Sequence, residues 1–199
     1  MRENRGLIIP SAPMKSSVFL NNGLLRCEVL PALGGCLVGL WRAGVPVLRT
    51  QAANTLQSAR QSASYPLIPY SNRIGDSVLC WAGKSYDLPR NNLPEQHVIH
   101  GTGFERAWTV QQVSESRLEL AYTHRADVSW PFDFDATQTM ELQPDTLLLS
   151  LHITNRSPQD APVGLGWHPF FVKRPGSHIR FAAQARWDMD DRKLPTQSR

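Results

Sequence analysis

The sequence has no long apolar run. None of its 199 residues belongs to a stretch approaching the ~18 consecutive apolar residues that a membrane helix needs. Residues 1–20 contain only a three-residue apolar run, Leu7-Ile8-Ile9, which is too short for the apolar region of a secretory signal. We therefore expect a cytoplasmic protein without a membrane partner.

Runs of positive charge are missing as well. The formal net charge is +4 and the pI is near 9.2, but the arginines are scattered and nowhere form a run of five basic residues. A chain that follows a phosphate backbone needs clustered basic residues, so we expect no nucleic-acid partner. With 41% hydrophobic and 19% charged residues, the composition is that of a globular protein. Residues 1–199 are interpreted as one domain.

Cysteine is scarce. Cys27, Cys36 and Cys80 are odd in number, show no C-x-x-C spacing and lie among apolar residues, which favours buried reduced thiols over a disulfide or a metal pair. His97 and His100 have no third ligand at zinc-like spacing. We expect no metal.

Patterns typical of long amphipathic helices are also absent. Instead, apolar and polar residues alternate with a period of two along most of the sequence. Turn residues interrupt the alternation every eight to twelve positions or so, which predicts an antiparallel all-β sandwich or barrel. Asn22-Gly23 predicts a type I′ hairpin turn, and residues 50–64 predict a loop or short helix. The expected strands are residues 18–20, 24–30, 36–41, 45–49, 77–81, 84–88, 108–113, 118–124, 132–142, 147–155, 163–172 and 178–187.

Three segments combine polar groups with prolines, glycines and aromatics: residues 65–76, 97–108 and 164–171. In the first, Arg73 follows Ser71 and Asn72 at the end of an apolar stretch and offers a fork of donors to a carboxylate or to paired sugar hydroxyls. The alternative for Arg73 is a surface bridge to Asp76.

Each of the other two segments holds one candidate histidine. His100 precedes Gly101, where the backbone can approach a ligand closely. His168 lies between Trp167 and Pro169, and enclosure by aromatics can tune an imidazole for acid or base chemistry. For both histidines a purely structural role stays open. Four tryptophans are candidates for the core or for the flat face of a sugar site: Trp81, Trp108, Trp130 and Trp167.

Taken together and in this order, these segments resemble those of aldose 1-epimerases, also called galactose mutarotases. The resemblance runs from about Leu24 to Thr196. Its motifs are Asn72-Arg73-Ile74-Gly75, Trp81 to Leu88, His100-Gly101 followed by Trp108, His168-Pro169-Phe170-Phe171 and Leu194-Pro195-Thr196.

The resemblance implies a galactose-mutarotase-like antiparallel β-supersandwich and an isomerase that interconverts the α and β anomers of free hexoses such as galactose or glucose. It implies His168 as the general acid at the ring oxygen, His100 as a second donor near it and Arg73 as a contact to sugar hydroxyls. His97 has no clear role in the family. No cofactor is implied.

The resemblance also implies a glutamate base and a sugar-binding aspartate after the Leu-Pro-Thr segment, where this sequence ends at Arg199. The chain is thus expected to be incomplete at its C-terminal end and weak or inactive alone. Glu95, Glu105 and Glu141 do not match the position of the base. The alternatives are a non-catalytic carbohydrate-binding or sugar-sensing protein and a hexose 6-phosphate mutarotase, for which Arg106 and Lys173 are the candidate phosphate contacts.

Overall fold

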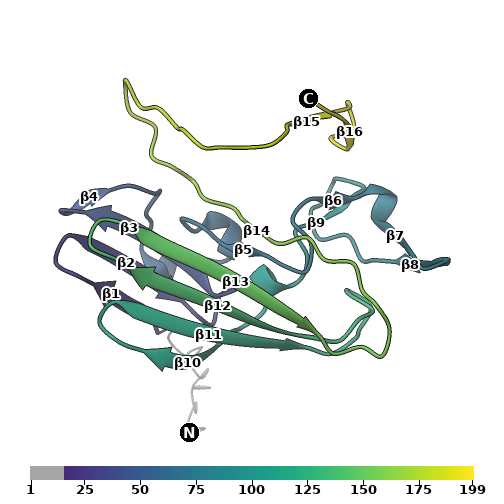
Figure 1. The fold of residues 1–199 in the computed structure, drawn as a ribbon, viewed down its shortest axis with the longest axis horizontal. Coiled ribbons are helices and arrows are strands. Elements are labelled where there is room, and N and C mark those ends of the chain that lie inside the picture. Colours follow the sequence, from purple (N-terminus) through teal and green to yellow (C-terminus); the bar gives the residue numbers. More distant parts are fainter. Residues whose placement is uncertain (1–15) are drawn as a thin grey trace, which may run out of the picture.

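Two four-stranded antiparallel sheets form the body of the protein. The computed structural model describes residues 16–199 (Figure 1). The first sheet has the order β1 (Val18–Asn21), β2 (Leu25–Leu30), β3 (Cys36–Arg42) and β4 (Val45–Pro46). The second has the order β10 (Thr109–Val113), β11 (Arg117–His124), β12 (Phe134–Leu142) and β13 (Leu147–Asn155).

Shorter antiparallel pairs connect and flank the sheets. They are β5 (Pro66–Leu67) with β14 (Gly166–Trp167), β6 (Arg73–Ile74) with β9 (Val98–Ile99), β7 (Val78–Trp81) with β8 (Lys84–Asp87), and β15 (Trp187–Met189) with β16 (Pro195–Ser198). The helical elements in residues 16–199 are four 3₁₀ turns: η1 (Ala53–Thr55), η2 (Ala59–Gln61), η3 (Gly75–Ser77) and η4 (Gly103–Glu105). The predicted all-β antiparallel class is confirmed, and η1 and η2 lie in the expected 50–64 loop. No helix within these residues is long and apolar enough to span a membrane.

The main core lies between the two sheets. Along β12 the side chains alternate strictly between buried and half-buried, as the period of two requires when one face of a sheet packs inward. Leu20 and Cys27 of the first sheet and Leu118, Leu120 and Met140 of the second belong to one buried cluster. Burial of this apolar surface is what holds the sheets together.

The first hairpin forms, but its type I′ turn was a wrong prediction. The turn covers Asn22–Leu25, where the Asn22 N–H donates to the Leu25 carbonyl (3.1 Å), and within it only Gly23 has a positive φ, of 90°. A type I′ turn needs positive φ at both central residues. The pairs Ala43-Gly44 and Ala82-Gly83 meet that condition in the β3–β4 and β7–β8 hairpins.

The last two predicted strands are also wrong in extent. Residues 163–172 yield only the two-residue β14, because Gly164 and Gly166 weaken a strand and Pro169 has no N–H to donate. Residues 178–187 contribute only Trp187, the first residue of β15, and their side chains are mostly exposed. In Figure 1 the chain leaves the sheets after β14 and returns as β15 and β16 near β6 and β9.

The cysteines divide into two groups. Cys27 and Cys36 are buried, as expected, and burial raises the pKa of the Cys27 thiol to about 12. Cys80 is exposed on β7, so the expectation of a third buried thiol is wrong. The apolar neighbours of Cys80 in sequence point to both faces of a hairpin with little cover, which sequence alternation alone does not reveal.

A close backbone crossing joins the first two chemistry-bearing segments. Ile68 and Gly101 form a parallel β-bridge, and the Thr102 and Gly103 N–H groups both donate to the Ile68 carbonyl (2.9 and 3.1 Å). A Cβ on Gly101 would lie 2.0 Å from the Ile68 carbonyl oxygen, and the φ of Gly101 is +72°. Only glycine fits this crossing.

We predict that Gly101→Ala lowers the free energy of unfolding by about 3 kcal/mol or more, because the methyl group must displace backbone as well as bear the φ strain. Gly83→Ala is the matched control, since its φ is +75° but nothing lies within 4 Å of the new Cβ. The Gly83→Ala substitution should lower the free energy of unfolding by only about 1 kcal/mol. Urea unfolding of both variants measures the difference, and equal losses would contradict the crossing.

Candidate functional site

Backbone hydrogen bonds bring the three segments together. His168 N–H donates to the Tyr65 carbonyl (3.1 Å), and Gly164 N–H donates to the Pro69 carbonyl (2.8 Å). His100 N–H donates to the Asn72 carbonyl (3.1 Å). The first segment therefore lies between the other two, and its main chain sets the positions of both candidate histidines.

The His100 ring is fixed in one tautomer. Its Nδ1 lies 2.9 Å from the Ser71 carbonyl oxygen, which can only accept, so Nδ1 carries the proton and Nε2 is an acceptor in the neutral ring. Burial lowers the pKa of His100 from 6.5 to about 4, with smaller contributions from His168, Arg60 and Arg73. His100 is thus neutral at pH 7, and its free nitrogen suits a hydroxyl donor.

The His168 ring packs against two aromatic rings, whose centroids are 6.3 Å apart. It stacks on Tyr65 with centroids 4.9 Å apart and on Phe170 with centroids 4.6 Å apart. Burial is the main cause that lowers the pKa of His168, and the charges of Arg60 and Arg49 act in the same direction. A partly enclosed imidazole with a depressed pKa gives up a proton readily once it is protonated.

The two histidines lie side by side. Their ring centroids are 5.3 Å apart at an interplanar angle of 78°. Arg73 joins them through the β6–β9 pairing, in which it lies opposite Ile99, the neighbour of His100. The structure thus brings together all three predicted site residues from distant parts of the sequence.

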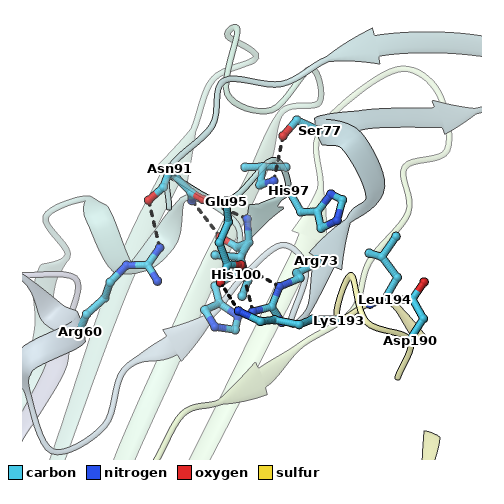
Figure 2. Close-up of polar contacts among 12 residues, drawn as sticks. Arg60, Arg73, Ser77, Asn91, Glu95, His97, His100, Asp190, Lys193 and Leu194 are labelled. Atoms are coloured by element: carbon cyan, nitrogen blue, oxygen red, sulfur yellow. Dashed lines mark hydrogen bonds and ion pairs between the residues drawn. The ribbon is translucent and has the colours of Figure 1, made fainter. Parts of the chain in front are cut away.

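Arg73 is held by a carboxylate other than the expected one. Its Nε and Nη2 both donate to Oε2 of Glu95 at 3.2 Å, and Lys193 Nζ donates to Oε1 of Glu95 at 2.5 Å (Figure 2). The alternative of a bridge to Asp76 is wrong, because Asp76 pairs with Arg192. The hydrogen bond from Lys193 is the largest cause that lowers the pKa of Glu95, and Arg73 lowers it further. Glu95 is therefore a poor proton acceptor.

His97 has a structural contact with the local backbone. Its Nδ1 accepts from the Asp76 N–H (2.8 Å) at η3, where Asp76 and Ser77 have positive φ. Figure 2 shows its ring apart from His100. Among residues 16–199, no three histidine, cysteine or acidic side chains cluster closely enough to hold a metal ion.

The remaining acidic and aromatic candidates lie in other settings. Glu141 pairs with Arg117 on the second sheet (2.9 Å), and burial raises the pKa of Glu105. Trp108 and Trp130 are buried in the core, as a structural role requires. Trp81 donates its indole N–H to the Asp160 carbonyl (2.9 Å), and Trp167 is half-buried.

The candidate phosphate contacts do not join this group of residues. Arg106 pairs with Asp127 at 3.5 Å. Lys173 borders a surface hollow of about 970 Å³ between the β3–β4 hairpin and residues 171–180, and neither candidate histidine lines it. The hollow is therefore separate from the candidate site.

Sequence reasoning missed the arginines and one aromatic ring around the histidines. Arg49 lies over the Phe170 ring at 3.8 Å, and Arg60 lies over the Phe104 ring at 4.7 Å. Tyr65 is the first residue of the first segment, but nothing in the sequence marked it as a neighbour of His168. A single arginine in a strand or a loop is indistinguishable in sequence from a surface charge, so only the fold could reveal these contacts.

Comparison with known proteins identifies the family of the chain. The family model for aldose 1-epimerase matches residues 17–198. The uncharacterized protein YphB of Escherichia coli is 32% identical over 168 residues, covering 84% of this chain and 56% of its own length. The uncharacterized protein YihR of the same organism is 28% identical over 107 residues, which are 53% of this chain and 35% of YihR.

Solved structures show the same fold. A putative aldose 1-epimerase from E. coli superposes with a TM-score of 0.80 at 29% identity, covering 92% of this chain and 61% of that one. A galactose mutarotase-like protein from Clostridium acetobutylicum gives a TM-score of 0.75 at 23% identity, with 92% and 60% covered. The matched region is 56% of YphB, 35% of YihR and about three fifths of the two solved structures. On the family match and the shared fold, the chain belongs to the aldose 1-epimerase family.

Proposed function

We propose that this chain forms the acid and hydroxyl-binding side of a mutarotase site for a free hexose. The observation that supports the proposal most is the juxtaposition of His100 and His168, 5.3 Å apart, next to Arg73. The substrate would be a cytoplasmic monosaccharide such as galactose or glucose. The reaction would be interconversion of its α and β anomers.

His168 is proposed as the general acid. A base takes the proton from the anomeric hydroxyl while the acid protonates the ring oxygen, so the C1–O5 bond breaks and an open-chain aldehyde forms. Rotation about C1–C2 and closure on the other face give the second anomer. The rings of Tyr65 and Phe170 hold the imidazole in one plane for this transfer.

His100 is proposed as an acceptor rather than the second donor expected from the resemblance. With Nδ1–H committed to the Ser71 carbonyl, the neutral ring offers a bare Nε2. A sugar hydroxyl can donate to it. The low pKa of His100 keeps this nitrogen unprotonated at the working pH.

Arg73 is proposed to bind sugar hydroxyls with the guanidinium nitrogen that is not hydrogen-bonded to Glu95. Glu95 takes Nε and Nη2, so Nη1 is the donor that can reach a ligand. Because Glu95 is engaged with Arg73 and Lys193, we do not assign it as the base. We propose that the base belongs to the part of the family fold that residues 1–199 do not match.

We predict that His168→Ala strongly lowers the rate of catalysed mutarotation, because the ring oxygen loses its proton donor. The assay follows the optical rotation of fresh α-galactose with this chain alone and with a fusion to the part of the E. coli relative that follows the matched region. The fusion should accelerate mutarotation far more than the chain alone, and His168→Ala should reduce its rate about 10²-fold or more.

His152→Ala, an exposed histidine on β13, is the matched control and should keep the full rate. Equal rates for the His168 and His152 variants would contradict the assignment of the acid. Sugar binding by the fusion without any acceleration would favour the carbohydrate-binding or sugar-sensing alternative.

We predict that Arg73→Lys weakens galactose binding about tenfold, because an ammonium cannot satisfy Glu95 with two nitrogens and still present a third. Isothermal titration calorimetry of the fusion measures the affinity. Arg117→Lys is the matched control, since Arg117 also contacts two carboxylates, Glu119 and Glu141, but on the second sheet. A tenfold loss of galactose affinity in Arg117→Lys as well would contradict the sugar-binding role of Arg73.

We predict that neutral His100 makes stability fall as the pH drops below 6.5. The unfolded chain takes up a proton near pH 6.5, whereas folded His100 does so only near pH 4. From pH 7 to pH 5 the free energy of unfolding of the wild type should therefore fall by about 2 kcal/mol more than that of His100→Gln, whose side chain does not titrate. Urea unfolding of both at the two pH values measures the slopes, and parallel slopes would refute the depressed pKa.

A further inference from the structure

Arg49 packs on Phe170 and Phe170 packs on His168, so these three groups form a stack, while the Tyr65 ring packs on His168 with its centroid 6.3 Å from that of Phe170. The Arg49 guanidinium lies 3.8 Å from the Phe170 ring centroid. The Phe170 and His168 centroids are 4.6 Å apart at 29°, and those of His168 and Tyr65 are 4.9 Å apart at 17°. Each flat group therefore limits the tilt of the next.

The outer end of this stack is anchored to the backbone. Arg49 Nε donates to the Ser62 carbonyl (3.1 Å), and Nη2 donates to the carbonyls of Arg60 (2.9 Å) and Ser62. The Arg49 N–H donates to the Phe170 carbonyl (2.7 Å). The guanidinium is thus fixed over the ring by η2 and by Ser62, the residue that follows η2, and its plane cannot rotate freely.

The charge of Arg49 has no carboxylate beside it. Among the ion pairs formed within residues 16–199, none includes Arg49. Its hydrogen bonds go to carbonyl oxygens, which leave the positive charge uncancelled. That charge therefore acts on the Phe170 ring and on His168 beyond it.

We propose that Arg49 is a positioning residue that clamps Phe170 and thereby sets the plane of the His168 ring. The inference rests on the proposed role of His168 for its functional meaning, but the clamp itself is a property of the free protein. It requires the planar fork of arginine, because a lysine ammonium makes no flat contact with a ring and cannot bind two carbonyls in a fixed plane.

Several groups act on His168 besides Arg49. The Tyr65 and Phe170 rings both pack on it, with their own centroids 6.3 Å apart, and His100 meets it edge-on at 5.3 Å. Arg60 and Arg49 are the cations that disfavour its charged form, after burial. Removing Arg49 takes away one of the two cations and loosens one of the two covering rings, so both effects should raise the pKa of His168.

The experiment is an NMR titration of the His168 ring in the free chain, with the signal assigned by its loss in His168→Gln. In Arg49→Met the pKa of His168 should rise by roughly half a unit or more. Nuclear Overhauser contacts between the His168 and Phe170 rings should weaken. Arg49→Lys, which keeps the charge without the fork, should weaken the ring contacts with a smaller change in pKa.

Arg26→Met is the matched control, because Arg26 lies over the Trp41 ring at 4.2 Å in the first sheet, away from His168. It should leave the His168 titration and ring contacts unchanged. Phe170→Leu is the second test if Arg49→Met folds poorly. It removes the linking ring while keeping the arginine, and it too should raise the pKa of His168.

The proposal is overturned if Arg49→Met and Phe170→Leu both leave the pKa and the remaining ring contacts of His168 as in the wild type. A loss of thermal stability alone would then assign Arg49 to anchoring η2 and Ser62. Because these readouts need no substrate, they hold or fail independently of the mutarotase assay on the fusion.

Discussion

The candidate site depends on the close backbone crossing of Gly101 and Ile68. At this point two segments approach so closely that a Cβ would lie 2.0 Å from a carbonyl oxygen. The crossing places His100 over the Ser71 carbonyl, which selects its tautomer. Adjacent backbone hydrogen bonds, from the His168 and Gly164 N–H groups to the Tyr65 and Pro69 carbonyls, then hold the third segment. The chemistry of both histidines therefore follows from a steric requirement for one glycine.

Burial and charge give the site two neutral imidazoles beside cations. Desolvation is the largest cause of the low pKa of both His100 and His168, and nearby guanidinium groups add to it. The one carboxylate on Arg73, that of Glu95, is shared with Lys193 from the turn between β15 and β16. The cationic side of the site is thus tied to the C-terminal hairpin, whose own contacts with the sheets are few.

This charge arrangement suits one half of an acid–base reaction. A histidine with a lowered pKa is a good proton donor once charged, and a neutral histidine with a fixed tautomer is a good acceptor for a hydroxyl. A carboxylate paired with two cations is a poor base. The site within residues 16–199 therefore supports donation and binding better than proton abstraction, which is why the proposed base is assigned elsewhere in the family fold.

The sequence by itself determined the fold class and most strand positions, because alternation and turn residues are local signals, whereas the convergence of the three segments was expected only from the family resemblance. It could not place residues 163–187, where glycine, proline and exposure outweigh apolar alternation. The partner of Arg73, the tautomer of His100 and the stack of Arg49 on Phe170 were decided only by the tertiary structure. Each of these contacts joins residues far apart in the chain, and sequence carries no record of which distant carbonyl or ring a side chain will meet.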